Sequence, residues 1–121
     1  MIDDLTGKGI CVIDLDTVMP GLVMNDFGDS IRTGASTAEE DEINLSLVSC
    51  SMELFETYTR GFLKGCGNSL TPLEVSLLPM GAKMMTYENG IRFLTDYLQG
   101  DVYFKIAREN HNLDRCRTQL K

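Results

Sequence analysis

Two aspartates, Asp14 and Asp16, are the residues whose type and spacing could do chemistry in this sequence. They follow an apolar run that begins at Ile10, and in an extended strand side chains two positions apart share one side. Paired carboxylates are hard oxygen ligands of the kind that Mg²⁺ prefers, with water and phosphate oxygens filling its remaining positions. A metal held this way neutralises charge during phosphoryl transfer. The spacing alone equally fits a strand that ends in solvated aspartates. It does not fit an EF-hand loop, because Val18 and Asn25 would occupy ligand positions.

The chain around these aspartates predicts an N-terminal β-hairpin. The run 10–15 is apolar and rich in β-branched residues, which indicates a buried strand. Residues 1–3 can pair with it through a turn at residues 5–9. The hairpin then begins abruptly at Met1, which suggests that the chain is the C-terminal part of a longer protein.

Helical signals follow the hairpin. Asp26 and Asp29 resemble a capping box, so a short helix is expected from Phe27, burying Phe27 and Ile31. Ser51 can cap a second helix that ends at Gly65 or Gly67. Beyond these we expect a surface loop at 33–49, a short helix from Thr71-Pro72 that Pro79 interrupts, a long helix from Met80 to Leu98 that Gly100 ends, and a polar tail at 110–121.

Apolar periodicity predicts which helix faces are buried. On the second helix the stripe is Leu54, Tyr58, Phe62 and Cys66. On the long helix it is Met84, Tyr87, Ile91, Leu94 and Leu98. The expected fold is therefore mainly α with an N-terminal β-hairpin, in a single domain.

Composition narrows the function. The 121 residues carry a net charge of −7, which disfavours binding to nucleic acid or to anionic membranes. No apolar run approaches membrane-spanning length, and the N-terminus does not resemble a signal peptide. The four cysteines form no CxxC pair and lie far from His111, so we expect reduced packing cysteines, no zinc site and a cytoplasmic location.

Longer segments resemble a known family. Val12-Ile-Asp-Leu-Asp-Thr-Val-Met-Pro-Gly21 followed by Asp26-Phe-Gly-Asp29 is similar to the metal-binding segment of aminoglycoside-phosphotransferase-like small-molecule kinases, and closest to their N-acetylhexosamine 1-kinase branch. The segments 58–62, 90–98, 100–105 and 111–117 are also similar to that branch. The resemblance implies that residues 1–121 are part of the C-terminal lobe of a protein-kinase-like fold.

The resemblance also implies roles for individual residues. Asp14 would be the principal Mg²⁺ ligand, with Asp16 as its acidic neighbour. Arg92 and Tyr103 would line the sugar pocket, where a guanidinium offers a fork of donors and a phenol offers a ring face and a hydroxyl. Alternatives stay open: Arg92 could pair with Asp96, and Tyr103 could be core packing. Among the remaining residues, His111 is expected to be structural or a cap, Asp26 and Asp29 to be caps, and Thr33 stands where the branch usually has an aromatic residue.

The catalytic base and nucleotide lobe of such kinases have no counterpart in the sequence, and the resemblance places them before Met1. We therefore expect a fragment of an ATP-dependent sugar kinase that is inactive alone and binds Mg²⁺ and ATP weakly or not at all. The partners of the parent enzyme would be ATP and a small sugar, and the isolated chain is expected to form a homodimer through the hairpin. The alternative is a non-catalytic binding or scaffold module. A D-x-D glycosyltransferase piece is disfavoured because no nucleotide-sugar domain precedes the motif.

Overall fold

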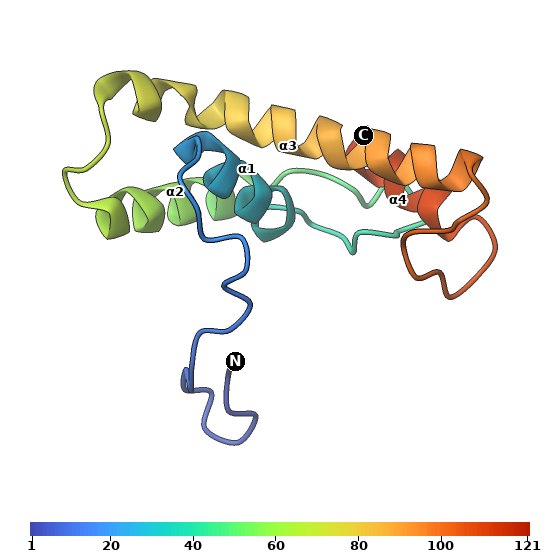
Figure 1. Cartoon of the computed structure of the whole chain (residues 1–121), viewed down its shortest axis with the longest axis horizontal. Helices are drawn as coiled ribbons and strands as arrows, with labels where there is room; N and C mark the ends of the chain where they lie inside the picture. Colours follow the sequence, from blue (N-terminus) through green and yellow to red (C-terminus); the bar gives the residue numbers. More distant parts are fainter.

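The computed structural model describes residues 1–121, and in it two of three shorter helices pack against one long helix (Figure 1). The helices are α1 (Val23–Gly34), α2 (Met52–Cys66), α3 (Pro72–Leu98) and α4 (His111–Gln119). Helix α1 packs across the first half of α3, and α4 packs along its second half. Helix α2 lies beside α1 and contacts it more sparsely. No helix combines the length and the hydropathy that a membrane span requires.

Capping residues set where two helices begin, and here the sequence predictions are confirmed. The Ser51 side chain accepts a hydrogen bond from the Leu54 N–H at 3.3 Å at the start of α2. At the start of α3, Thr71 and Glu74 form a reciprocal capping box. The backbone N–H of Thr71 donates to the Glu74 carboxylate, which lowers the pKa of that carboxyl. Helix α1 differs, because it begins at Val23 and its N-cap, Leu22, makes no side-chain bond. The prediction that Asp26 and Asp29 cap a helix from Phe27 is therefore wrong.

The apolar core lies where α1 meets α3. It consists of Phe27, Ile31, Ala35 and Leu78, so the predicted burial of Phe27 and Ile31 is confirmed. The ring of Phe27 makes T-shaped contacts with three α2 aromatic rings, with centroids 5.2 to 6.2 Å away: Phe55, Tyr58 and Phe62. The predicted α2 stripe is corrected at one position. Leu54 is about half exposed and does not pack on the core, whereas its neighbour Phe55 does.

Two glycines allow α1 and α3 to approach closely. A Cβ atom added to Gly28 would lie 2.3 Å from the carbonyl oxygen of Gly81. A Cβ atom added to Gly81 would lie 2.2 Å from the carbonyl oxygen of Met24. Both obstacles are backbone atoms, so no rotation of a side chain would make room. The helices therefore cross at a pair of positions where only glycine fits.

Helix α3 corrects two predictions. It continues through Pro79, where an interruption was expected, because packing against α1 on both sides of the proline outweighs the lost backbone hydrogen bond. Its predicted apolar stripe is also wrong, since Met84, Tyr87 and Leu98 are each at least 41% exposed. The buried face instead carries small and polar residues together with apolar ones: Leu78, Gly81, Asn89, Gly90, Phe93 and Asp96. The spacing of apolar residues cannot reveal a buried face on which several positions are glycine or polar, so this face was not predicted.

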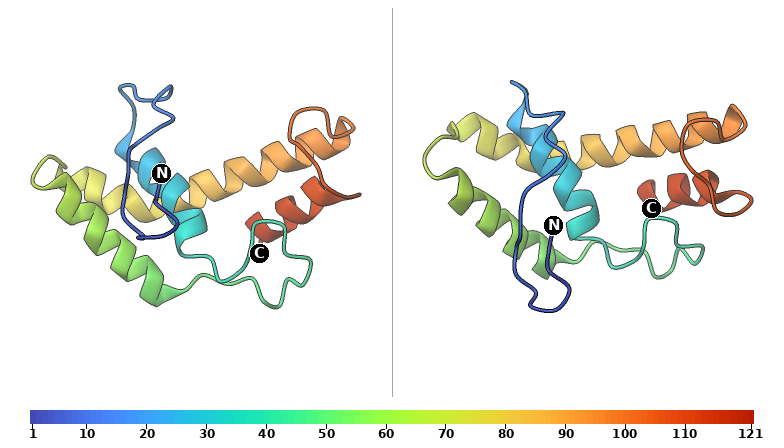
Figure 2. Two further views of the ribbon diagram at one scale, coloured as in Figure 1. Left: turned by 90° about the horizontal axis from the view of Figure 1, so that it is seen from below. Right: turned by 60° about the horizontal axis from the view of Figure 1, so that its bottom comes forward.

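The predicted N-terminal β-hairpin is absent, so the fold is a small all-helical domain. A turn forms where the Asp3 carboxylate accepts hydrogen bonds from two following backbone N–H groups, but only a single bridge, Ile2 to Gly9, follows it. The run 10–15 is not a strand, and its apolar side chains are more than half exposed. A two-stranded ribbon that no other element covers is marginal in water, which accounts for the difference. Figure 1 shows residues 1–22 projecting away from the helices, and in the two views of Figure 2 the same segment overlaps them because it points toward the viewer.

Candidate functional site

The two predicted metal ligands lie in this projecting segment. Asp14 and Asp16 are both exposed, and Asp14 has a left-handed backbone conformation, with φ of 62°. The extended alternation that would place both carboxylates on one side is therefore broken at Asp14 itself. Nowhere in the chain do three or more His, Cys, Asp or Glu side chains gather as a metal site. Carboxylates are chemically suitable ligands for Mg²⁺, but these two, as they are arranged here, do not form a site that fits it.

The two predicted sugar-binding residues lie side by side. The guanidinium carbon of Arg92, on α3, is 6.0 Å from the ring centroid of Tyr103 and 5.4 Å from that of Phe104. The two rings meet edge to face at 4.8 Å, and Phe104 also packs on Phe93. Tyr103 is 73% exposed, so it is not core packing. We call Arg92, Tyr103 and Phe104 the arginine–aromatic surface.

Arg92 keeps most of its hydrogen-bonding capacity. Its only ion pair is with Glu88, one turn earlier on α3, at a long 3.7 Å, and both side chains are nearly half exposed. A pair of this kind contributes little to stability. The predicted alternative partner, Asp96, points elsewhere. The guanidinium is therefore accessible to a ligand that lies against the Tyr103 ring.

Asp96 anchors the loop that carries the aromatic residues. Its carboxylate accepts hydrogen bonds from the backbone N–H groups of Val102 (3.0 Å), Tyr103 (2.8 Å) and Phe104 (3.0 Å). A fourth comes from the side-chain amide of Asn112 on α4, at 2.9 Å. Burial raises the pKa of Asp96, but these four donors outweigh it and hold the pKa below its ordinary value.

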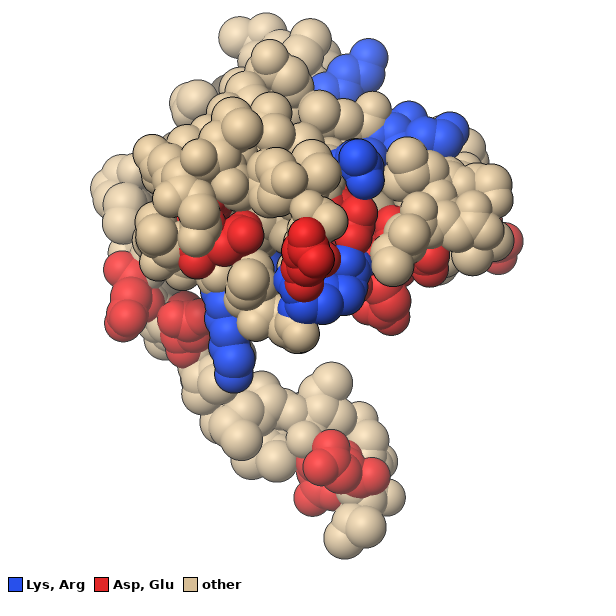
Figure 3. Space-filling model, turned by 90° about the vertical axis from the view of Figure 1, so that its right-hand side faces the viewer, with Lys and Arg blue, Asp and Glu red and all other residues tan.

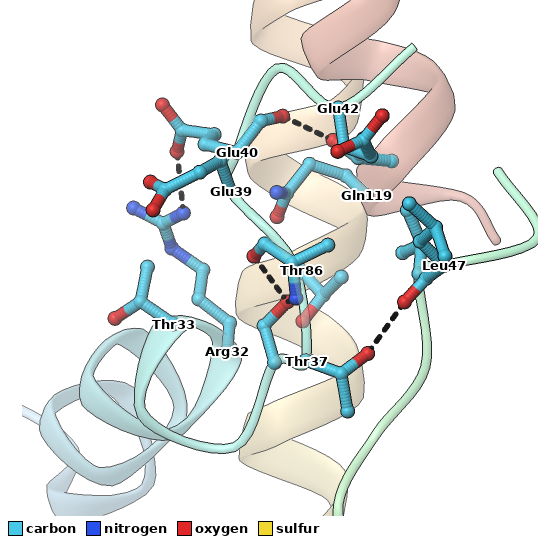
Figure 4. A pocket seen from close by; sticks show the side chains of 13 residues that line it. Arg32, Thr33, Thr37, Glu39, Glu40, Glu42, Leu47, Thr86 and Gln119 are labelled. Atoms are coloured by element: carbon cyan, nitrogen blue, oxygen red, sulfur yellow. Dashed lines mark hydrogen bonds and ion pairs between the residues drawn. The ribbon is translucent and has the colours of Figure 1, made fainter. Parts of the chain in front are cut away.

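A polar pocket of about 750 Å³ lies on another part of the molecule (Figure 4). Residues from α1, α3, α4 and the loop 36–48 line it, and Figure 4 shows three loop glutamates above hydroxyl and amide side chains from the helices: Glu39, Glu40 and Glu42. Arg32 lies at its edge and pairs with Asp29 and Glu40, each at 2.9 Å. Burial lowers the pKa of Arg32, but these two partners outweigh it, and the pKa is raised. The pocket keeps a net negative lining.

His111 helps to hold the loop that forms this pocket. As the first residue of α4, it is buried, and its Nε2 lies 3.0 Å from an Asp41 carboxylate oxygen. Its Nδ1 accepts a hydrogen bond from the Ala107 N–H at 3.0 Å. Arg108 bridges Asp41 and Asp114. Figure 3 views the molecule from this side, where acidic and basic side chains interleave and residues 1–22 project below.

The structure thus brings together one of the two predicted residue pairs. Arg92 and Tyr103 share a surface, whereas the segment with Asp14 and Asp16 lies away from it (Figures 1 and 2). Neither the anchoring role of Asp96 nor the polar pocket was predicted from the sequence. The acidic run 39–42 was a signal for the pocket, but it is equally typical of a solvated loop. No protein-family model matches the chain.

Proposed function

We propose that this chain contributes the carbohydrate-binding surface of an ATP-dependent sugar kinase, with N-acetylhexosamine or a similar sugar as substrate. The observation that carries the proposal is the contact between Arg92 and Tyr103. The resemblance assigned both residues to sugar binding, and they lie together on an exposed surface from two separate elements.

The chemistry of the surface suits a sugar. The exposed face of an aromatic ring packs against the apolar C–H groups of a pyranose, and the Tyr103 hydroxyl can donate or accept a hydrogen bond. The Arg92 guanidinium offers several donors in a fixed plane to hydroxyl or N-acetyl carbonyl oxygens. Both kinds of contact are needed, because a ring without a donor would not orient the sugar.

Catalysis would need groups that this chain does not supply. In the proposed parent enzyme the base and the ATP-binding lobe would be supplied by groups outside residues 1–121, and Asp14 and Asp16 would hold Mg²⁺ only after the projecting segment is rearranged. The chain alone is therefore expected to show no phosphoryl transfer from ATP. The proposed location is the cytoplasm, which the four free cysteines support.

Sugar binding can be measured directly on the chain by two-dimensional NMR titration with N-acetylglucosamine, with glucose as the comparison. We expect the amide signals of residues 92 and 102–104 to shift with saturation. Arg92→Ala and Tyr103→Ala should each weaken binding by roughly three- to tenfold. Arg60→Ala is the matched control, because Arg60 has a similar ion pair one turn earlier on α2, with Glu56. Absence of saturable shifts, or equal effects of Arg60→Ala and Arg92→Ala, would refute the proposal.

A second candidate function, a non-catalytic interaction module, is favoured by the exposed apolar side chains of residues 10–22. Such side chains are rarely left uncovered in a row. We propose that they mediate homodimer formation, through the projecting segment and not through a hairpin. Light scattering after size exclusion should give a dimer whose mass halves in Ile10→Ser/Val12→Ser. Lys8→Ser is the control on the same segment, and a monomeric native chain would exclude the dimer.

A further inference from the structure

The loop between α3 and α4 is held by an internal anion. Three successive backbone N–H groups, those of residues 102 to 104, converge on the carboxylate of Asp96. Converging N–H groups form a concavity that binds anions. In this chain the anion comes from the last turns of α3 itself, and Asp96 is only 3% exposed.

Side chains of α4 hold the Asp96 carboxylate in place through further hydrogen bonds. Asn112, which is fully buried, donates from one amide nitrogen to Asp96 at 2.9 Å and to Asp101 at 2.8 Å. The oxygen of the same side chain accepts from Arg115 at 2.9 Å, and Arg115 also donates to the Lys105 carbonyl at 3.3 Å. The network thus spans α3, the loop and α4.

These bonds decide where the aromatic rings lie. Gly100 turns the chain with φ of 93°, and Asp101 follows with φ of 57°, so the backbone leaves α3 in a sharp turn. The N–H of Asp101 bonds to the Asp96 carbonyl at 2.8 Å. The next three N–H groups bond to its carboxylate, and the side chains of Tyr103 and Phe104 are thereby presented to Arg92, one turn before Asp96 on the same helix.

We propose that Asp96 is a positioning residue for sugar binding: its carboxylate fixes the 101–104 turn and so holds Tyr103 and Phe104 against Arg92 before any ligand arrives. This inference rests on the proposed function and deepens it. Asp96 itself does not touch the sugar. Its effect on binding passes through the three amides, because a surface that is ordered in advance loses less conformational entropy when a ligand binds.

The test combines hydrogen exchange with sugar titration in Asp96→Asn. The asparagine replaces one acceptor oxygen by an NH₂ group, which faces donors that can no longer be satisfied. We expect exchange at the amides of residues 102–104 to accelerate by at least about tenfold, and affinity for N-acetylglucosamine to fall at least about threefold. Amides in α1 and α2 should keep their protection, which shows that the domain remains folded.

Asp101→Asn is the matched control. It removes the same charge from a neighbouring carboxylate that Asn112 also bonds, but keeps an oxygen that accepts from Asn112, so both exchange and affinity should stay near those of the native chain. If Asp96→Asn does not fold, Asp96→Glu retains the charge and displaces the carboxylate by one methylene. The same acceleration at the three amides with weaker sugar binding would then support the inference.

These experiments distinguish failure of the proposed sugar-binding function from failure of the inference about Asp96. A native chain that binds no sugar refutes the proposed function, and with it any role of Asp96 in sugar binding. A native chain that binds sugar, with unchanged affinity in Asp96→Asn, refutes only the inference. Unchanged exchange at residues 102–104 in a folded Asp96 variant refutes it as well.

Discussion

Replacement of Gly81 by alanine is the sharpest test of how this domain is held together. In Gly81→Ala the new Cβ atom would lie 2.2 Å from the Met24 carbonyl oxygen and 2.9 Å from its Cβ. A real Cβ atom needs more than 3 Å from either. The obstacle is the backbone of α1, so the two helices must move apart. That movement would loosen the contacts of Phe27 and Leu78, which form the centre of the core.

The magnitude follows from two opposing effects. Insertion of a methyl group into a closely packed contact costs about 1–3 kcal/mol. Alanine in place of glycine inside a helix gains about 1 kcal/mol. Because the blocked atoms are backbone, we expect the upper part of the first range and a net loss of about 1–2 kcal/mol. For a domain of this size the corresponding fall in Tm is roughly 4–10 °C.

Gly61→Ala supplies the control within α2. No heavy atom lies within 4 Å of a Cβ atom at position 61, so only the helix-propensity gain remains. We expect this variant to be more stable than the native chain by about 0.5–1 kcal/mol. Urea unfolding followed by far-UV circular dichroism measures both variants. Opposite signs are expected, and a Gly81→Ala protein as stable as Gly61→Ala would refute the close-crossing explanation.

Two further predictions concern single interactions. Thr71→Ala removes the half of the capping box in which the Thr71 hydroxyl accepts from the Glu74 N–H, and should lower the free energy of unfolding by about 1 kcal/mol in the same urea experiment, with Thr95→Ala, an exposed helix position, as the control. Asp96 has a folded pKa below its ordinary 3.8, so its contribution is present above that pH and is lost as pH falls through the folded value. The urea midpoint of the native chain should therefore drop more steeply below about pH 4 than that of Asp96→Asn, and parallel pH profiles would contradict the role of this carboxylate.

Local signals predicted the starts of α2 and α3 because caps act within three residues. Ser51 and the Thr71–Glu74 pair satisfy backbone N–H groups that every helix leaves unpaired, so their meaning does not depend on tertiary structure. Pro79 shows the opposite case. Proline disfavours a helix interior because it lacks a backbone N–H, but the packing of α3 on α1 keeps the helix continuous through Pro79. The N-terminal strand failed for the same reason, since a strand needs a partner that this chain does not place beside it.

Some features of the candidate site could also be predicted from the sequence, and others could not. The resemblance assigned Arg92 and Tyr103 to the sugar pocket, and the structure places the Arg92 guanidinium carbon 6.0 Å from the Tyr103 ring centroid, while their role in sugar binding stays a prediction. The argument that Asp14 and Asp16 share one side depended on an extended backbone, and the left-handed conformation of Asp14 breaks that alternation, so their joint role as metal ligands stays a prediction. Asp96 was considered only as an ion-pair partner. Its acceptance of three backbone bonds depends on the turn at residues 100–101, which no helical periodicity describes.

The buried face of α3 explains why these successes and failures fall where they do. Its first half meets α1 through Gly81 and Leu78, where close approach of the two backbones is the dominant interaction. Its second half meets α4 and the loop through Asn89, Phe93 and Asp96, where satisfied polar groups share the interface with one apolar ring. Helix α3 has no continuous apolar stripe, because neither its contact with α1 nor its contact with α4 and the loop is made by apolar side chains alone. Stability and presentation of the arginine–aromatic surface thus depend on different ends of one helix. Gly81→Ala should therefore lower Tm while leaving the 102–104 amides bonded to Asp96, since the crossing with α1 lies four turns away along α3.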